Sequence, residues 1–176
     1  MNTDKPLRLF FALPCPPRLA GSICRWRDAQ GLAGRPVPEA NLHLTLAFLG
    51  SQPAHTLDAL VQLARPLHTD AFVLRLDELH TIGHGFACLV PSQVPPPLSH
   101  LVGQLHAKLC AHGVALDSRP FLPHVTLSRE TAPGPQPRPP VFEWRVERFG
   151  LYLSENVGHG VQYRELSSWP LTAPRG

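Results

Sequence analysis

Apolar and polar residues alternate along two separate stretches of the chain, and both stretches contain the same short pattern. Within residues 42–48, alternate positions are apolar, and residues 123–128 repeat the alternation. A period of two is typical of a half-buried strand, whose successive side chains point to opposite faces. We expect one face to enter the core, with Leu42, Leu44, Leu46 and Phe48 in the first stretch. The other face carries His43 and Thr45 in the first stretch and His124, Thr126 and Ser128 in the second.

The remaining patterns predict helices and further strands. Apolar residues recur every three to four positions, as in amphipathic helices, over residues 17–30, 56–67 and 98–110. Short apolar or alternating runs predict strands at residues 7–13, 71–79, 86–90, 141–154 and 161–169. The turn Gly83-His84-Gly85 would join the second and third of these as a hairpin. The proline-rich segment 132–140 is expected to be an exposed mobile loop.

Composition fits one folded domain with a loop-rich surface. The 176 residues are 43% hydrophobic and include 21 prolines, well above the usual share. The net charge of +3 permits an anionic substrate without requiring one. Only Lys5 and Lys108 are lysines. Arginine is better suited to bidentate phosphate contacts, although genome composition can produce the same bias.

Several function classes lose support because their sequence features are missing. The four cysteines have neither metal-site nor disulfide spacing, so we expect free thiols in a reducing cytoplasm. The apolar run near the N-terminus is short and ends at Pro14, which predicts no cleavable signal. No run is long enough to cross a membrane. Phosphate-binding loops and paired zinc-ligand motifs do not occur, so we expect no cofactor and no metal, and the chain is expected to act as a monomer.

The paired motifs carry a family resemblance. His43-Leu44-Thr45-Leu46 and His124-Val125-Thr126-Leu127 resemble the motifs of the two-histidine phosphoesterase superfamily. Within it, the chain is similar to the bacterial RNA 2',3'-cyclic phosphodiesterases once called 2'-5' RNA ligases. Blocks that agree in the same order cover nearly the whole chain, at residues 8–13, 41–50, 121–129 and 151–154. One departure is Arg35-Pro36-Val37, where that subfamily often has a tryptophan before the valine.

The resemblance implies a fold as well as an activity. It implies an α+β domain over residues 1–176, bilobal and pseudo-twofold, with two antiparallel sheets facing across a central cleft and helices on the outside. The implied substrate is RNA or a nucleotide that ends in a 2',3'-cyclic phosphate, and the implied product is a 2'-phosphomonoester.

The motif residues suit phosphodiester chemistry. Hydrolysis needs a base for the water, an acid for the leaving oxygen and donors for the phosphate. Two histidines that titrate near neutrality can divide the first two roles, and spacing alone does not say which does which. The resemblance implies that His43 is the acid for the leaving 3'-oxygen and His124 the base. By the same resemblance, Thr45, Thr126 and Arg129 bind the phosphate.

Other readings of the same residues stay open. The scaffold would also suit reversible 2'-5' RNA ligation, cleavage of a small cyclic nucleotide, or binding of RNA ends without turnover. Each histidine could instead be a surface residue of its strand with no role in catalysis. Phe10, Phe11 and Phe121 are expected in the core, with a base-stacking role for one of them as the alternative.

Overall fold

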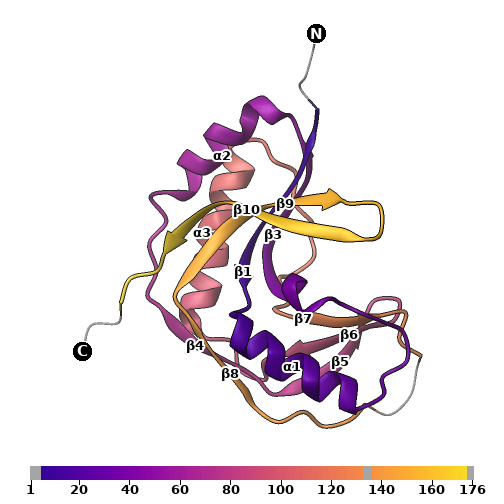
Figure 1. The fold of residues 1–176 in the computed structure, drawn as a ribbon. Coiled ribbons are helices and arrows are strands. Elements are labelled where there is room, and N and C mark those ends of the chain that lie inside the picture. Colours follow the sequence, from indigo (N-terminus) through magenta and orange to yellow (C-terminus); the bar gives the residue numbers. More distant parts are fainter. Residues whose placement is uncertain (1–4, 133–135, 174–176) are drawn as a thin grey trace.

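A large antiparallel sheet forms the centre of the molecule (Figure 1). The computed structural model describes residues 5–132 and 136–173. In the described part, the strand order is β10-β9-β1-β3-β7-β6-β5, and the short β2 pairs with β7. The strand bounds are β1 (Leu7–Pro14), β2 (Arg35–Pro36), β3 (His43–Gln52), β5 (Glu78–Ile82), β6 (Phe86–Val90), β7 (Val125–Arg129), β9 (Arg148–Asn156) and β10 (Val161–Pro170).

A second, two-stranded sheet pairs β4 (Phe72–Leu76) with β8 (Phe142–Val146). The prediction of single strands at 71–79 and 141–154 is therefore wrong, because each run divides between the two sheets. The first run breaks at Asp77, whose carboxylate accepts hydrogen bonds from the Ser92 amide and hydroxyl at 2.8 and 2.5 Å. The hairpin across residues 83–85 is confirmed, but β5 and β6 form it.

Three α-helices of the described chain cover the sheets on their outer sides (Figure 1). The predicted helices are confirmed as α1 (Pro17–Ala29), α2 (Leu57–Ala64) and α3 (Pro96–Ala111). The first begins with proline, whose fixed φ suits an N-terminal turn. Helix α1 contacts β8, whereas α3 lies against β3, and α2 packs against α3. No helix in the described residues is long and apolar enough to cross a membrane.

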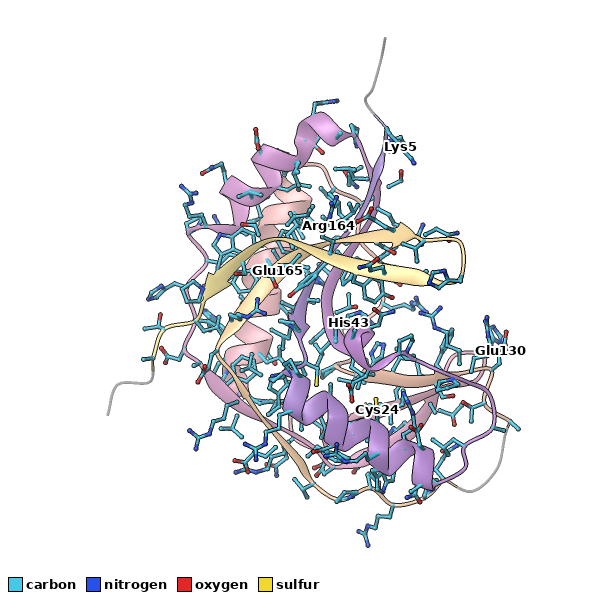
Figure 2. The ribbon with its side chains drawn as sticks, in the orientation of Figure 1. Lys5, Cys24, His43, Glu130, Arg164 and Glu165 are labelled. Atoms are coloured by element: carbon cyan, nitrogen blue, oxygen red, sulfur yellow. The ribbon has the colours of Figure 1, made fainter. Side chains whose placement is uncertain are left out.

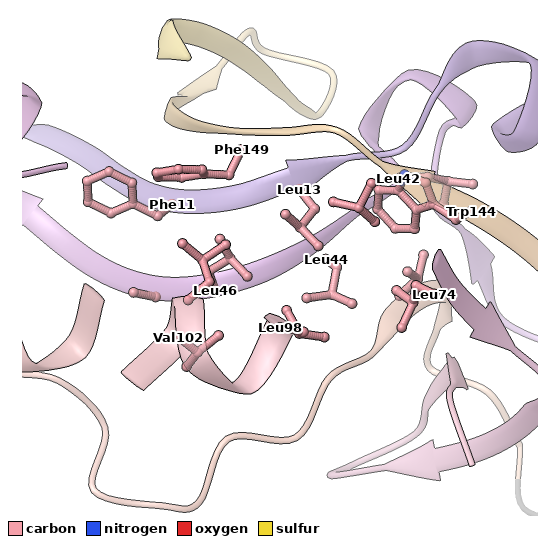
Figure 3. Close-up of a cluster of buried hydrophobic side chains, with 14 of the residues drawn as sticks. Phe11, Leu13, Leu42, Leu44, Leu46, Leu74, Leu98, Val102, Trp144 and Phe149 are labelled. Carbon is pink, nitrogen blue, oxygen red and sulfur yellow. The ribbon is translucent and has the colours of Figure 1, made fainter. Parts of the chain in front are cut away.

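One continuous apolar core joins both sheets to the helices. Phe11 and Leu13 of β1 and Leu44 of β3 are fully buried, and they lie in the same cluster as Leu98 of α3 and Trp144 of β8 (Figure 3). The leucines that alternate with the motif residues are part of this cluster, as the pattern predicted. The opposite face of β3 is thereby left to His43 and Thr45.

The register of β3 against β1 contains two irregularities that change which residues face the core. Thr45 pairs with Ala12 but Ala47 with Phe11, so Leu46 is an extra residue. A bulge of this kind reverses the alternation beyond it. Leu46 is buried, whereas Phe48 is 50% exposed. The prediction that Phe48 enters the core is wrong for this reason.

The two strands that follow the pattern of the motifs, β3 and β7, are neighbours in the large sheet. In the described register, β3 and β7 pair at Leu44 and Val125, and the strands that carry the two motifs diverge on either side of this pair. The α+β class with two antiparallel sheets is confirmed. Part of the predicted loop 132–140 has no helix or strand, and residues 133–135 lie outside the described residues.

Candidate active site

A pocket of about 340 Å³ opens where the two motif strands diverge. His43 and Thr45 line it from one side and His124, Thr126 and Arg129 from the other, so the structure brings together all five predicted site residues. No Asp or Glu is among the described residues that line it. A pocket whose described lining includes two histidines and two arginines and no carboxylate favours an anionic ligand.

His43 is held in one orientation by the backbone that precedes it. Its Nδ1 lies 2.7 Å from the carbonyl oxygen of Asn41. Because a carbonyl only accepts, Nδ1 carries the proton, and Nε2 of the neutral ring keeps its lone pair. The hydroxyl of Thr45 lies 3.0 Å from Nε2 and donates to it in this state. The nitrogen that faces the motif threonine is therefore the one available for proton transfer.

His124 is anchored in the same way in the other half of the molecule. Its Nδ1 lies 2.7 Å from the carbonyl oxygen of Leu122, again two residues earlier in the chain. The same argument places the proton on Nδ1 and leaves Nε2 for the pocket. Strand β7 itself begins at Val125, so His124 stands just before the strand. The two motifs thus present the same nitrogen of the same tautomer to one pocket.

His43 sits among aromatic rings on the site face of the sheet. The ring centroids of Phe10 and Tyr163 lie 5.1 and 5.0 Å from that of His43 (Figure 2 labels His43 itself). Burial lowers the pKa of His43, and the nearby His124 and Arg129 lower it further by charge repulsion. The hydrogen bond to the Asn41 carbonyl acts in the opposite direction. The free protein therefore favours neutral His43.

A buried thiol contacts the second motif threonine. The Sγ of Cys88 lies 3.6 Å from the Oγ1 of Thr126. Burial raises the pKa of Cys88 to about 11, so the group stays a neutral thiol. Cys88 and Thr126 face one another across the β6–β7 pair. The hydroxyl of Thr126 consequently borders both the pocket and the neighbouring strand β6.

A buried arginine supports the second motif strand from below. Arg27 of α1 is only 7% exposed, and its Nη1 donates to the carbonyl oxygens of Val37 and Leu127 at 2.6 and 3.2 Å. Its Nε pairs with Asp28 at 2.9 Å. Hydrogen bonds from a charged donor are stronger than those from a neutral donor. Helix α1 is thereby tied to the strand that presents Thr126.

The comparisons with known proteins agree with this geometry. Residues 15–158 match the family described as the 2'-5' RNA ligase superfamily. The chain belongs to this superfamily. It is 36% identical over 174 residues to the RNA 2',3'-cyclic phosphodiesterase of Escherichia coli strain K12, covering 96% of this chain and 99% of that protein. A second relative, the RNA 2',3'-cyclic phosphodiesterase of Thermus thermophilus, is 28% identical over 193 residues, covering 97% and 93%.

Solved structures similar to this chain have the same fold. The crystal structure of Escherichia coli LigT in apo form superposes with a TM-score of 0.89 at 35% identity, covering 96% of this chain and 99% of that one. LigT complexed with 3'-AMP also gives 0.89 at 35% identity, covering 95% and 99%. The expected family is confirmed, and so is its fold.

Some pocket residues of this superfamily member were missed by the sequence pattern. Arg8 and Phe48 line the pocket; their place on the site face depends on the register of β1 against β3. Asn41 donates from its side chain to the Val161 carbonyl at 2.9 Å, which links the start of β3 to β10. Tyr163 reaches the site through the pairing of β9 with β1, which no local signal predicts.

The three phenylalanines considered for base stacking lie in or against apolar clusters, and Phe10 is the one of the three that also lines the pocket. Phe10 is 4% exposed and contacts His43, Tyr152 and Tyr163, whereas Phe11 is fully buried in the main core. Phe121 packs against the same core. The half-exposed ring in the pocket is that of Phe48. An exposed ring beside an anion-binding pocket is a surface on which a planar group can stack.

Proposed function

We propose that this protein is a hydrolase that opens the 2',3'-cyclic phosphate at the end of an RNA chain to a 2'-phosphomonoester. The observation that carries the proposal is the matched pair of imidazoles, His43 and His124, each anchored through Nδ1 with Nε2 at a pocket whose described lining contains no carboxylate. The superfamily and the names of both relatives support the same activity.

In the proposed reaction, the two histidines exchange protons with opposite ends of the reacting phosphorus. His124 takes a proton from water as the water oxygen bonds to phosphorus. His43 donates a proton to the 3'-oxygen as the bond from phosphorus to that oxygen breaks. The hydroxyls of Thr45 and Thr126 and the guanidinium of Arg129 donate to the non-bridging oxygens. The acid and base assignment follows the family resemblance.

The acid role of His43 requires its ring to be protonated when substrate is bound. Burial lowers the pKa of His43 in the free protein. A bound phosphodiester places a negative charge beside the ring, and an opposite charge favours the protonated form. Substrate binding would therefore act against the lowered pKa at the moment when the proton is needed.

Metal is not needed in this mechanism, because the histidines and the threonines supply the proton transfers and the phosphate contacts. We further propose that the protein acts as a cytoplasmic monomer. Cys15, Cys24, Cys88 and Cys110 are free thiols, which suits a reducing compartment.

The decisive experiment uses a short oligoribonucleotide with a 2',3'-cyclic phosphate end. We expect the mass to increase by one water and the end group to match a 2'-phosphate standard by chromatography. His43→Ala and His124→Ala should each slow the reaction by about 100-fold or more, while circular dichroism and substrate binding stay close to wild type. Joining of RNA ends without hydrolysis would favour the ligase, and a 3'-phosphate product would reverse the leaving group.

Treatment with a chelator tests the metal-free mechanism. We expect full activity after extensive dialysis against EDTA, because the catalytic groups are side chains of the protein. A metal-bound water would instead be lost with the metal. Activity that disappears with chelator and returns with Mg²⁺, Mn²⁺ or Zn²⁺ would refute the mechanism. Binding of the cyclic end without turnover in either condition would favour a recognition module.

A further inference from the structure

A second cation lines the pocket, far from the motif residues in the sequence. Arg8 of β1 is exposed and borders the same pocket as Arg129 of β7. In the sheet order, β3 lies between β1 and β7. His43 and Thr45 therefore stand between two arginines, and the mechanism proposed above uses only one of them.

The register places Arg8 well beyond the reacting phosphate. Ala12 pairs with Thr45, and Arg8 lies four residues further along β1, opposite Ser51. At about 3.3 Å per residue, the backbone positions of Ala12 and Arg8 are ~13 Å apart. Arg8 shares the site face of β1 with Phe10, since alternate residues of a strand point the same way. Its guanidinium thus serves a different part of the ligand from Thr45 and Arg129.

Arg8 is oriented but not neutralised. Its guanidinium carbon lies 5.0 Å from the centre of the Phe48 ring, a contact that attracts a cation and restricts its rotamers. Among the described residues it has no carboxylate partner, unlike Arg35 and Arg164, which pair with Glu130 and Glu155. An ordered, unpaired guanidinium in a pocket is suited to an anionic group.

We propose that Arg8 binds a second phosphate, the one attached to the 5'-carbon of the nucleoside whose 2',3'-cyclic phosphate is hydrolysed. The inference rests on the proposed function, which places the cyclic phosphate between His43 and His124. The ribose carries its 5'-carbon on the side opposite the 2'- and 3'-oxygens, so a second phosphate lies one nucleoside away from the first. This phosphate is the internal diester of an RNA chain or a terminal 5'-monophosphate.

Binding of product analogues tests Arg8 without depending on turnover. Adenosine 2'-phosphate and adenosine 2',5'-bisphosphate differ only in the second phosphate. By calorimetry, we expect wild type to bind the bisphosphate about tenfold more tightly, as one charge-assisted contact implies. Arg8→Gln should reduce the ratio to about one. Lys5→Gln is the matched control, because Lys5 is an exposed cation near the start of β1 that does not line the pocket.

Hydrolysis identifies the source of the second phosphate. The substrates are adenosine 2',3'-cyclic phosphate with a free 5'-hydroxyl, the same compound with a 5'-phosphate, and the dinucleotide ApA with a 2',3'-cyclic phosphate end. A preference for the dinucleotide that Arg8→Gln removes supports an RNA subsite. A preference confined to the 5'-phosphorylated mononucleotide supports a terminal monophosphate subsite.

Three results would overturn the role of Arg8. These are equal binding of the two analogues by wild type, an unchanged ratio in Arg8→Gln, and an equal loss of both ligands in that variant, which would mean that Arg8 only positions Phe48. Absence of hydrolysis with all three substrates would refute the proposed enzyme instead, and the calorimetric ratio would still decide whether Arg8 binds a second phosphate.

Discussion

The tautomer of each motif histidine depends on a residue two positions earlier in the chain. Asn41 and Leu122 contribute only their carbonyl oxygens to these contacts. Side-chain substitutions there leave the acceptor in place, because every residue has a backbone carbonyl. The repeated His-apolar-Thr spacing indicated the histidines and threonines, since a period of two puts them on one face. It could not indicate the carbonyls, which depend on how the chain enters each strand.

The electrostatic environment of His43 gives a direct test. Burial, His124 and Arg129 lower its pKa, so in an NMR titration of the free protein we expect its midpoint below the usual value of about 6.5. Arg129→Gln removes one positive charge and should move the midpoint upward, but not fully, because burial is the larger cause. Inorganic phosphate should also move it upward. If neither Arg129→Gln nor inorganic phosphate moved the midpoint of His43, the proximity of His43 to Arg129 and to the phosphate site would be contradicted.

The same lowered pKa makes a prediction about stability. The unfolded chain binds a proton at His43 more readily than the folded protein does, so protonation favours unfolding. The stability that neutral His43 contributes is fully present above about pH 6.5. It is lost as the pH falls from there through the pKa of His43 in the folded protein. By urea unfolding, the free energy of unfolding should fall less between pH 7.5 and pH 5.0 in His43→Gln than in wild type. Equal losses would mean that folding does not lower the pKa of His43.

Leu46 and Phe48 show how the β3 bulge changes the burial that the hydrophobic pattern predicts. Both occupy apolar positions of one alternating run, yet Leu46 is 1% exposed and Phe48 is 50% exposed. We expect Leu46→Ala to lower the free energy of unfolding by about 2–5 kcal/mol. Phe48→Ala should cost about 1 kcal/mol or less, mainly through the contact with Arg8. Chemical denaturation measures both, and equal losses would place Phe48 in the core.

At the scale of elements, sequence periodicity predicted the helices and most strands but not how the strands divide between sheets. Strands β4 and β5 are separated by one residue, Asp77, and nothing in the alternation of 71–79 marks the change of partner. Strands β4 and β8 pair with each other although they lie about seventy residues apart in the chain. Such pairing is decided by the shared core and not by local preference. The bulge that exposes Phe48 has the same origin.

The end of β7 depends on a close approach that only glycine allows. Gly34 has φ +114°, and a Cβ there would lie 2.2 Å from the carbonyl oxygen of Arg129. Gly34→Ala should therefore lower the free energy of unfolding by about 3 kcal/mol or more. It should also reduce kcat/KM, because the backbone that carries Arg129 must move.

Gly31 provides the matched control for Gly34. It also has a positive φ, +61°, but a Cβ there would meet nothing within 4 Å. Gly31→Ala should cost about 1–2 kcal/mol from backbone strain alone and leave kcat/KM close to wild type. Urea unfolding and steady-state kinetics on both variants distinguish strain from displacement. Similar activity in the two variants would show that Arg129 does not depend on Gly34.

At the scale of the whole molecule, the pocket belongs to neither end of the sheet alone. His43 stands on β3 and Thr126 on β7, and these strands pair at Leu44 and Val125. The family resemblance implied two lobes, whereas in the structure one large apolar cluster contains residues from both ends of the large sheet. A shared core keeps the two histidines at a fixed separation, because close-packed interiors resist deformation.

A main core that contains residues from both ends of the large sheet predicts that these two ends unfold together. Trp169 packs on Phe11 and Phe149 at one end, and Trp26 packs on Phe142 at the other. In Trp26→Phe and Trp169→Phe variants, the remaining fluorescence should change at the same urea concentration as the far-ultraviolet circular dichroism of that variant, as in a two-state transition. Two separate transitions would mean that residues 1–176 form two units, and the distance between His43 and His124 would then depend on more than the core they share.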